Sequence, residues 1–269
     1  MLPQNAPTSS RSRSAGEAPP VVPWPALYQE KAGQLWEAMH PDGPDEQHGL
    51  HILFVGPTQS GKTTLAFYLT LLRDWVVVLG TKPKDPSLDR YLAAGYLRID
   101  HWPPTKKDRR KGENDLGWRE NEGRYIVWPA ITRREELHAF RPLYAQVIND
   151  VFAEGNWTFV ADEGLWLGSR EGLKLGPELS GLAYGAASNG VSMYLLMQRP
   201  AGIPRIAWSS VMEAEIFHMG VTSDVQEMAS LSPYEPLDVK RAIRRLRGYQ
   251  FLSLPLRGGS EWAVSQVEM

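Results

Sequence analysis

Short apolar runs divide the chain and predict its strands. Continuous runs indicate buried strands at residues 51–55, 75–79, 97–99, 125–128, 157–161 and 193–197, and further strands at 215–219 and 249–252. Between them, apolar residues recur with helical spacing at 63–72 and 132–152, and a glycine-interrupted helix is predicted at 177–187. Buried strands that alternate with helices predict an α/β fold, a mainly parallel sheet with helices on both faces.

The segments outside this pattern set the domain boundaries. Residues 1–24 are rich in Pro, Ser, Ala and Arg, a composition that buries little apolar surface, so we expect a disordered tail. Helical spacing at 24–39 predicts a lead-in helix, and one domain is expected over 25–269. A polar, charged insert at 103–122 predicts an exposed loop or hairpin, and residues 132–135 resemble a capping box that starts a helix.

Composition excludes several classes of function. Of the 269 residues, 42% are hydrophobic and 22% are charged, which is typical of a globular protein. The chain has no cysteine, which excludes disulfides, cysteine zinc sites and thiol catalysis. No secretory signal opens the chain and no apolar run is long enough to span a bilayer, so we expect a cytosolic protein that does not enter a membrane. The net charge of −2 means that any DNA contact needs a local basic patch or a pore built by several subunits.

One segment matches a phosphate-binding motif in full. Gly56-Pro57-Thr58-Gln59-Ser60-Gly61-Lys62-Thr63 fits the P-loop pattern G-x-x-x-x-G-K-[ST] and lies between a predicted strand and a predicted helix. The glycines let backbone N–H groups converge on phosphates, and the helix directs its positive end at them. Lys62 is predicted to contact the β- and γ-phosphates, the Thr63 hydroxyl to ligate Mg²⁺, and Thr64 to complete the nucleotide-binding set. The motif therefore predicts ATP and Mg²⁺ as cofactors.

Two acidic residues follow the predicted strand at 157–161. Asp162 can hold Mg²⁺ through its water shell, and Glu163 can polarise the attacking water as a general base. A strand that ends in an acid also occurs by chance or as a helix cap, but about 100 residues after a P-loop it indicates a hydrolytic site. The adjacent Glu indicates the additional-strand, RecA-like branch of P-loop NTPases. In this branch another strand lies between the P-loop strand and the acidic strand, and the runs at 75–79 and 125–128 leave room for it.

A third element is the strand at 193–197, which ends in Gln198. Its amide suits a sensor of the γ-phosphate, while a polar strand end turning into a loop explains it equally well. Gln198-Arg199-Pro200, with Ile203-Pro204 after it, resembles the T-Q-R-P stretch of the FtsK–HerA superfamily of DNA-pumping ATPases. Residues 76–82, 159–163 and the P-loop agree with that superfamily in order and spacing, and the look-alikes include genome-packaging ATPases of bacteriophages and mobile elements.

The resemblance implies a RecA-like core, a homo-oligomeric ring, expected to be a hexamer, and double-stranded DNA threaded through its pore. It also implies a phage or mobile-element ATPase of a bacterial cytoplasm, with a recruiting protein as a further partner. One departure concerns the arginine that many relatives carry before the sensor strand, since Ala187 stands near its expected place. Such an arginine completes the neighbouring subunit's site; Arg170 and Arg205 are the candidates to replace it, and ordinary solvated arginines are the alternative.

Basic segments at 106–111 and 240–247 are candidates for contact with DNA, although a solvated loop and a solvated helix face explain them as well. The sequence thus favours an Mg²⁺-dependent ATPase that drives DNA translocation or packaging. The alternative is an ATP-dependent switch with slow turnover that binds protein partners, which the Ala187 departure favours. A kinase does not need the Asp-Glu pair, and a GTPase would need an N-K-x-D motif that does not occur.

Overall fold

The computed structural model describes residues 18–39, 48–105, 123–200, 210–257 and 261–268. Within these residues one sheet of nine strands has the order β3-β4-β2-β5-β6-β1-β7-β8-β9. The strands are β1 (Ile52–Val55), β2 (Trp75–Leu79), β3 (Leu97–Ile99), β4 (Gly123–Val127), β5 (Thr158–Ala161), β6 (Ser192–Met197), β7 (Glu213–Phe217), β8 (Gln250–Pro255) and β9 (Ala263–Gln266). From β3 to β7 every pair is parallel, and β8 and β9 join in antiparallel fashion. The mainly parallel sheet is as predicted.

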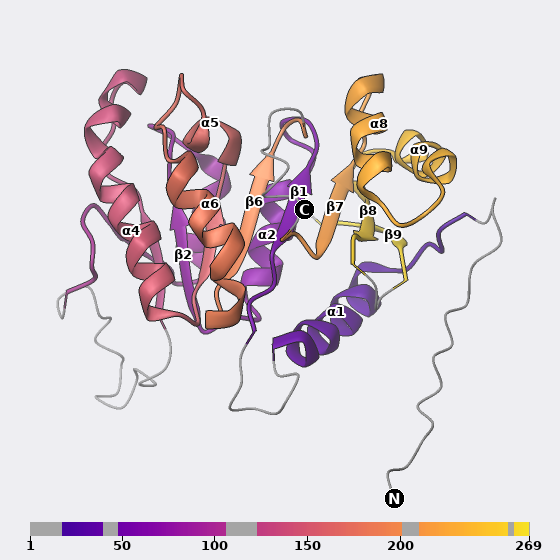
Figure 1. The fold of residues 1–269 in the computed structure, drawn as a ribbon, viewed down its shortest axis with the longest axis horizontal. Coiled ribbons are helices and arrows are strands. Elements are labelled where there is room, and N and C mark those ends of the chain that lie inside the picture. The colour runs from indigo at the N-terminus through magenta and orange to yellow at the C-terminus, as the bar shows by residue number, and fades with distance from the viewer. Residues whose placement is uncertain (1–17, 40–47, 106–122, 201–209, 258–260, 269) are drawn as a thin grey trace, which may run out of the picture.

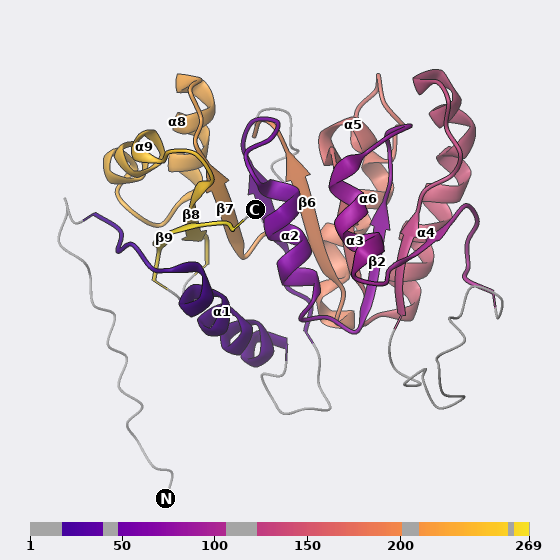
Figure 2. The ribbon, with the colours of Figure 1, turned by 180° about the vertical axis from the view of Figure 1, so that it is seen from behind.

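Helices cover both faces of the sheet (Figures 1 and 2). On one face lie α4 (Arg141–Glu154), α5 (Gly164–Gly168), α6 (Gly176–Gly185), α8 (Thr222–Leu231) and α9 (Pro236–Arg245), which pack on side chains such as Leu53 and Val55. On the other lie α1 (Trp24–Met39), α2 (Lys62–Thr70) and α3 (Asp89–Ala93), which pack on Ile52 and Phe54. Alternate residues of β1 thus enter the two layers, which explains its continuous apolar run.

The sheet order corrects one prediction. A strand does lie between the P-loop strand β1 and the acidic strand β5, as the additional-strand arrangement requires. That strand is β6, at 192–197, and not the run at 75–79 or 125–128. The run at 75–79 is β2, on the far side of β5, and β4 lies one strand further out. Spacing along the chain does not reveal this order. A crossover between parallel strands can place the next strand on either side of the previous one in the sheet.

The predicted capping box is also different in detail. The helix begins as a 3-10 segment at Arg134–Phe140 and continues as α4 from Arg141. The carboxylate that accepts hydrogen bonds from Thr132 N and Arg133 N is that of Glu136, not of Glu135. Because Arg133 is the N-cap, Glu136 occupies the third helical position, from which a carboxylate reaches back to the first N–H groups.

The end of the predicted tail is structured. Val22 N donates to Val264 O and Val264 N donates to Pro20 O, so this segment pairs with β9. Trp24, at the start of α1, is 7% exposed and its ring lies 5.9 Å from that of Phe251. The expectation of disorder up to residue 24 is therefore wrong for 20–24, because backbone hydrogen bonds to β9 and the buried ring of Trp24 hold this segment in place. Residues 1–17, most of the insert at 103–122 and the basic run at 106–111 lie outside the described residues.

Three loops meet at the carboxyl edge of the parallel strands. They are the P-loop after β1, the 80–85 loop after β2 and the acidic pair after β5. No helix within the described ranges is long and apolar enough to cross a membrane.

Candidate functional site

The P-loop is a tight turn between β1 and α2. Gly61 has φ 104°, which side-chain-bearing residues rarely adopt, and a Cβ on Gly56 would lie 2.6 Å from Phe217 Cβ. Both positions therefore require glycine. Ser60 Oγ is buried and has no hydrogen-bond partner in the described part of the chain. An unpartnered, buried hydroxyl in a glycine-containing turn at the start of a helix is a group that an anion such as a phosphate would satisfy.

Lys62 begins α2 and is only 8% exposed. Its Nζ donates to Gly56 O and Pro57 O, both at 2.7 Å, so the ammonium rests on carbonyls of its own loop. Burial lowers the pKa of Lys62 to about 8, although the nearby charge of Asp162 opposes the fall. A buried ammonium whose hydrogen bonds go to neutral carbonyls would gain much from a phosphate.

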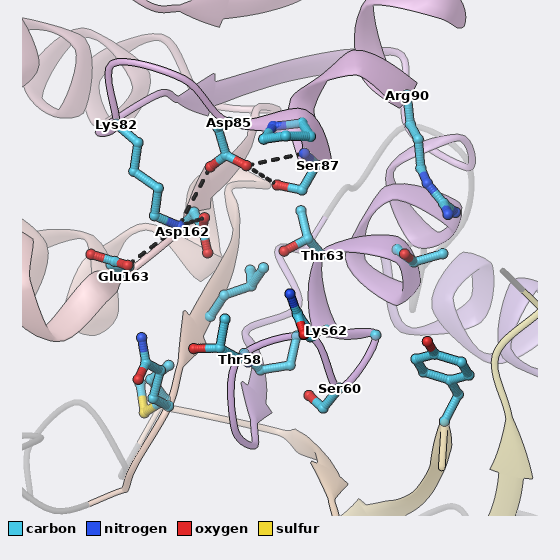
Figure 3. Close-up of a pocket in the computed structure, with 18 residues that line it drawn as sticks. Thr58, Ser60, Lys62, Thr63, Lys82, Asp85, Ser87, Arg90, Asp162 and Glu163 are labelled. Atoms are coloured by element: carbon cyan, nitrogen blue, oxygen red, sulfur yellow. Dashed lines mark hydrogen bonds and ion pairs between the residues drawn. The ribbon is translucent and has the colours of Figure 1, made fainter. Parts of the chain in front are cut away.

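The acidic pair lies opposite the P-loop (Figure 3). Asp162 is 7% exposed and follows the last residue of β5. Glu163 has φ 59°, in the left-handed region, and α5 starts at the next residue. Non-glycine residues in this conformation are uncommon and cluster at functional sites. Figure 3 shows both carboxylates on the same side of the site, with Lys62 and Thr63 facing them.

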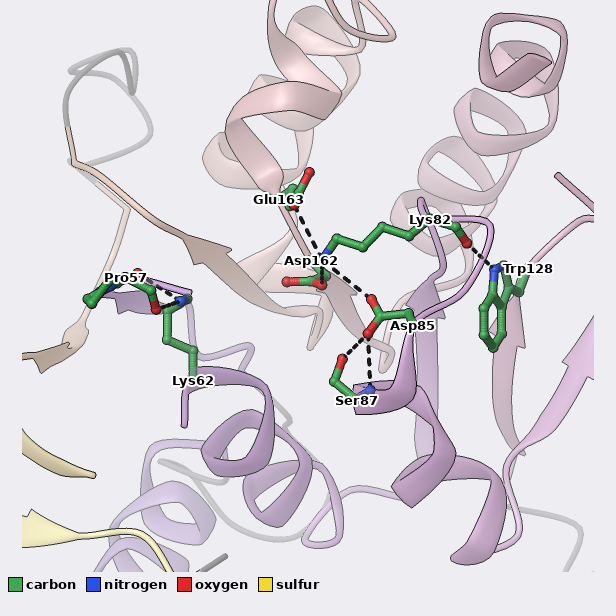
Figure 4. A network of polar contacts seen from close by, with 9 residues as sticks. Pro57, Lys62, Lys82, Asp85, Ser87, Trp128, Asp162 and Glu163 are labelled. Carbon is green, nitrogen blue, oxygen red and sulfur yellow. Dashed lines mark hydrogen bonds and ion pairs between the residues drawn. The ribbon is translucent and has the colours of Figure 1, made fainter. Parts of the chain in front are cut away.

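A second lysine joins the acidic residues to one another (Figure 4). Lys82 Nζ lies 2.9 Å from Asp162 Oδ2, 3.3 Å from Glu163 Oε1 and 3.4 Å from Asp85 Oδ2. Burial alone would lower the pKa of Lys82, but Asp162 and the other carboxylates raise it above its usual value. Asp85 also accepts hydrogen bonds from Ser87 N and the Ser87 hydroxyl. Lys82 and the three carboxylates are called the Lys82 cluster below.

These elements enclose a cleft of about 540 Å³, a size suited to a nucleotide. The residues that line it are Thr58 to Thr64, Lys82, Asp85, Pro86, Ser87, Arg90, Asp162, Glu163, Leu196, Met197, Gln198 and Tyr249. Gln198 belongs to this set because β6 pairs with both β1 and β5, so its end lies between the P-loop and the acidic pair. Its side chain is exposed.

The structure therefore brings together most of the predicted site. The cleft is lined by the P-loop residues from Thr58 onward, by the acidic pair and by Gln198. Gly56 and Pro57 do not line it, but their carbonyls accept hydrogen bonds from Lys62. Arg170 does not line it, and lies exposed in the turn between α5 and α6. Arg205, Ile203 and Pro204 lie outside the described residues.

The lining residues that were not predicted include four with charged or aromatic side chains: Lys82, Asp85, Arg90 and Tyr249. Lys82 and Asp85 follow the predicted strand at 75–79, so polar residues at the end of a parallel strand were the available signal. Arg90, on α3, points into the site from its edge (Figure 3). Tyr249 lies against the P-loop, where a Cβ on Gly61 would be 3.6 Å from its ring. Nothing in the local sequence of either residue signals this position.

The residues fit Mg²⁺ and ATP. The orphaned Ser60 hydroxyl, the glycine-lined turn and Lys62 suit a phosphate chain. The Thr63 hydroxyl and the Asp162 carboxylate are the oxygen donors that Mg²⁺ prefers, on facing walls of the cleft.

The fold is similar to that of solved viral packaging enzymes. The genome packaging NTPase B204 from Sulfolobus turreted icosahedral virus 2, in complex with ATP-gammaS, aligns with a TM-score of 0.54 and 12% identity over 80% of this chain and 96% of that chain. B204, the DNA-packaging ATPase of Sulfolobus turreted icosahedral virus, aligns with a TM-score of 0.52 and 16% identity over 77% of this chain and 92% of that one. The cytoplasmic domain of the Type VII secretion ATPase EccC of Thermomonospora curvata aligns with a TM-score of 0.51 and 12% identity, over 83% of this chain but 26% of that one.

No protein-family model and no curated protein sequence matches the chain. The likeness to B204 spans nearly the whole of that protein, 96% of its chain. The chain thus has the mainly parallel, additional-strand P-loop NTPase fold of the genome-packaging NTPases, and the resemblance predicted from its motifs is confirmed at the level of the fold.

Proposed function

We propose that this protein is an ATP-binding, Mg²⁺-dependent ATPase that drives DNA translocation or packaging as a ring. The observation that carries the proposal is the meeting of the P-loop with Asp162 and Glu163 across one cleft of about 540 Å³. A phosphate cradle alone would fit any nucleotide-binding protein. The facing acidic pair adds what hydrolysis needs, a metal ligand and a general base.

Each residue has a defined role in this proposal. Lys62 leaves the carbonyls of Gly56 and Pro57 and pairs with phosphate oxygens. Thr63 and Asp162 hold Mg²⁺, which neutralises phosphate charge when bound with ATP. Glu163 accepts a proton from the attacking water. The Gln198 amide, between the P-loop and the acidic pair, reports whether the γ-phosphate is present.

The ring and the DNA are proposed from the shared fold and from exposed basic residues. B204 is a DNA-packaging ATPase, and the shared fold supports a similar task for this chain. A bacterial cytoplasm as location and double-stranded DNA as partner belong to the proposal through the motif resemblance alone. The exposed arginines of the α9 region offer a local basic surface: Arg241, Arg244, Arg245 and Arg247. Arg170 lies exposed and is free to reach a neighbouring subunit, as a trans arginine in a homo-oligomer must. A hexamer and a recruiting protein complete the proposal.

The alternative, an ATP switch with slow turnover, is favoured by one specific contact. Glu163 Oε1 lies 3.3 Å from Lys82 Nζ, so the base is engaged in an ion pair. Ala187, where relatives carry an arginine, begins a short 3-10 segment and offers no charge. Hydrolysis assays separate the two functions.

The decisive experiment compares ATPase rates with and without double-stranded DNA for the wild type, Glu163→Gln and Glu171→Gln. Glu171 is an exposed glutamate outside the cleft and serves as the matched control. We expect DNA to stimulate the wild type and Glu171→Gln, and Glu163→Gln to lose about 10²–10⁴-fold in rate while it still binds ATP. Native mass spectrometry with ATP should show a ring. A strict monomer with a near-zero rate that DNA does not change would support the switch.

A further inference from the structure

Lys82 places one positive charge among three acidic side chains. An ammonium group has three N–H donors, and the three carboxylates match that number. Asp85 and Asp162 are nearly buried, with 7% and 11% of their side chains exposed, whereas the Lys82 side chain is 38% exposed. Carboxylates this close repel one another where water is partly excluded, so the lysine holds together a group that would otherwise separate.

The backbone beneath Lys82 is fixed. The Tyr144 hydroxyl donates to Gly80 O at 2.7 Å, and Trp128 Nε1 donates to Lys82 O at 2.7 Å. A Cβ on Gly80 would lie 2.6 Å from Trp128 Cγ, so strand and indole pack without spare room. Figure 4 shows the Lys82 side chain extending from this anchored point to Asp162 and Glu163. The part of Lys82 that can move is therefore its side chain, which has four rotatable bonds and is in contact with water.

The oxygen that Lys82 contacts is one that the proposed chemistry needs. Lys82 Nζ donates to Asp162 Oδ2, on the carboxylate that faces Thr63 across the cleft. The same ammonium also pairs with Glu163, the proposed base. A lysine and a metal ion cannot both occupy the same face of one carboxylate, because the two cations repel each other.

We propose that Lys82 is a displaceable positioning residue: it holds Asp85, Asp162 and Glu163 in place as their counter-ion in the metal-free protein, and Mg²⁺ must displace it from Asp162. This inference rests on the proposed function for the identity of the cation. Removal of the ammonium leaves the three carboxylates without their shared cation and removes the competitor of Mg²⁺ at Asp162. The variant protein therefore binds Mg²⁺ more tightly than the wild type, and it depends on Mg²⁺ for part of its stability.

The test is a thermal unfolding titration of the nucleotide-free protein with MgCl₂, at constant ionic strength, for the wild type, Lys82→Met and Lys84→Met. Lys84 lies in the same loop with an exposed side chain and is the matched control. We expect the Mg²⁺ concentration at half of the Tm rise to be about tenfold lower for Lys82→Met than for the wild type. Lys84→Met should follow the wild type. Lys82→Arg, which keeps the charge, should stay close to the wild type as well.

A half-point for Lys82→Met equal to or above that of the wild type overturns the proposal, as does a Tm that does not respond to Mg²⁺. If Lys82→Met does not fold, the same Mg²⁺ titration is made with Lys82→Gln, which keeps a hydrogen-bond donor and lacks the charge. Its half-point should also be lower than that of the wild type. A fluorescent ATP analogue added with Mg²⁺ tests the proposed function separately. If the wild type does not bind the analogue, nucleotide binding fails, while the titration without nucleotide still decides the role of Lys82.

Discussion

Two groups of one lysine and several carboxylates lie in the part of the chain that the structure describes, and they differ in their access to water. In the cleft, the Lys82 cluster has a lysine that is 38% exposed. In the core, Lys31 of α1 pairs with Glu213 and Glu215 of β7, and its side chain is 3% exposed. Lys31 Nζ lies 2.9 Å from Glu215 Oε1, and the Ser253 hydroxyl donates to Glu213 Oε1 at 2.9 Å. These four residues are called the Lys31 cluster.

The Lys31 cluster is buried, so a cation from solution does not reach its carboxylates to replace Lys31. Burial alone would lower the pKa of Lys31, but Glu213 and Glu215 raise it above its usual value. Burial raises the pKa of Glu215 to about 7, although Lys31 opposes the rise. The Lys31 cluster joins α1 to the central sheet, so it acts as a structural contact. The same chemical groups at the cleft remain open to a competing cation, and we infer that exposure separates a structural ion pair from a functional one.

The largest expected effect comes from Lys31→Met, which keeps an unbranched side chain one atom shorter and removes the charge. It leaves two buried carboxylates without their cation, a change that costs about 3–5 kcal/mol. The measurement is the free energy of unfolding from urea denaturation. Mg²⁺ should not restore the loss, because the cluster is closed to solvent. The comparison fails if Lys31→Met costs no more than Lys82→Met, or if Mg²⁺ stabilises both variants equally.

The next effect is a pH dependence that Glu215 confers. An acid whose folded-state pKa is raised stabilises the fold below its ordinary value, and this stabilisation is lost as the pH rises through the folded-state value. For Glu215 the window runs from its ordinary pKa of 4.5 to about 7. The wild type should therefore lose about 2 kcal/mol of unfolding free energy from this group between pH 5 and pH 8.5.

Glu215→Gln should lack this component, so its stability curve against pH should be flatter than that of the wild type. Urea unfolding at several pH values measures the difference. Glu171→Gln, at an exposed glutamate, is the control and should reproduce the wild-type slope. If the Glu215→Gln curve parallels that of the wild type over this range, Glu215 is already ionised in the core.

The fold was predictable where the local pattern carries the information. Strands β1, β2, β5 and β6 are continuous apolar runs because helices cover both of their faces. Strand β9 was missed, because Ala263–Gln266 is short and mixed, and it becomes a strand only through its pairing with β8 and Val22. The order of the strands also escaped prediction, since it depends on crossovers that no single segment specifies.

The site divides in the same way. The P-loop could be predicted because its residues are contiguous and their spacing follows from the shape of a phosphate. The Lys82 cluster was not, because residues 82, 85, 162 and 163 meet only when β2 pairs with β5. Arg170 is proposed on its chemistry, and its side chain lies exposed in the turn between α5 and α6.

The smallest expected effect concerns an ion pair that differs from the Lys31 cluster, because its carboxylate is buried while its cation is exposed to water. Arg199 Nε lies 2.9 Å from Asp224 Oδ2 and its Nη2 donates to Oδ1 at 3.1 Å, while the two side chains are 56% and 4% exposed. This bidentate pair fixes the segment after Gln198 to α8. Arg199→Ala should lower the free energy of unfolding by less than Lys31→Met does, because Arg199 is exposed to water in the folded protein and its removal leaves one carboxylate without its cation rather than two.

A double-mutant cycle gives the sharper measurement of this pair. In an Asp224→Asn background the buried charge is gone, so Arg199→Ala should then cost close to nothing in urea unfolding. Arg199→Lys should fall between the wild type and Arg199→Ala, since lysine keeps the charge but cannot form both bonds. Equal costs of Arg199→Ala in both backgrounds would show that Asp224 is not the source of the effect. Exposure of the cation would then have no bearing on the strength of such pairs, and the contrast between Lys31 and Lys82 would need another cause.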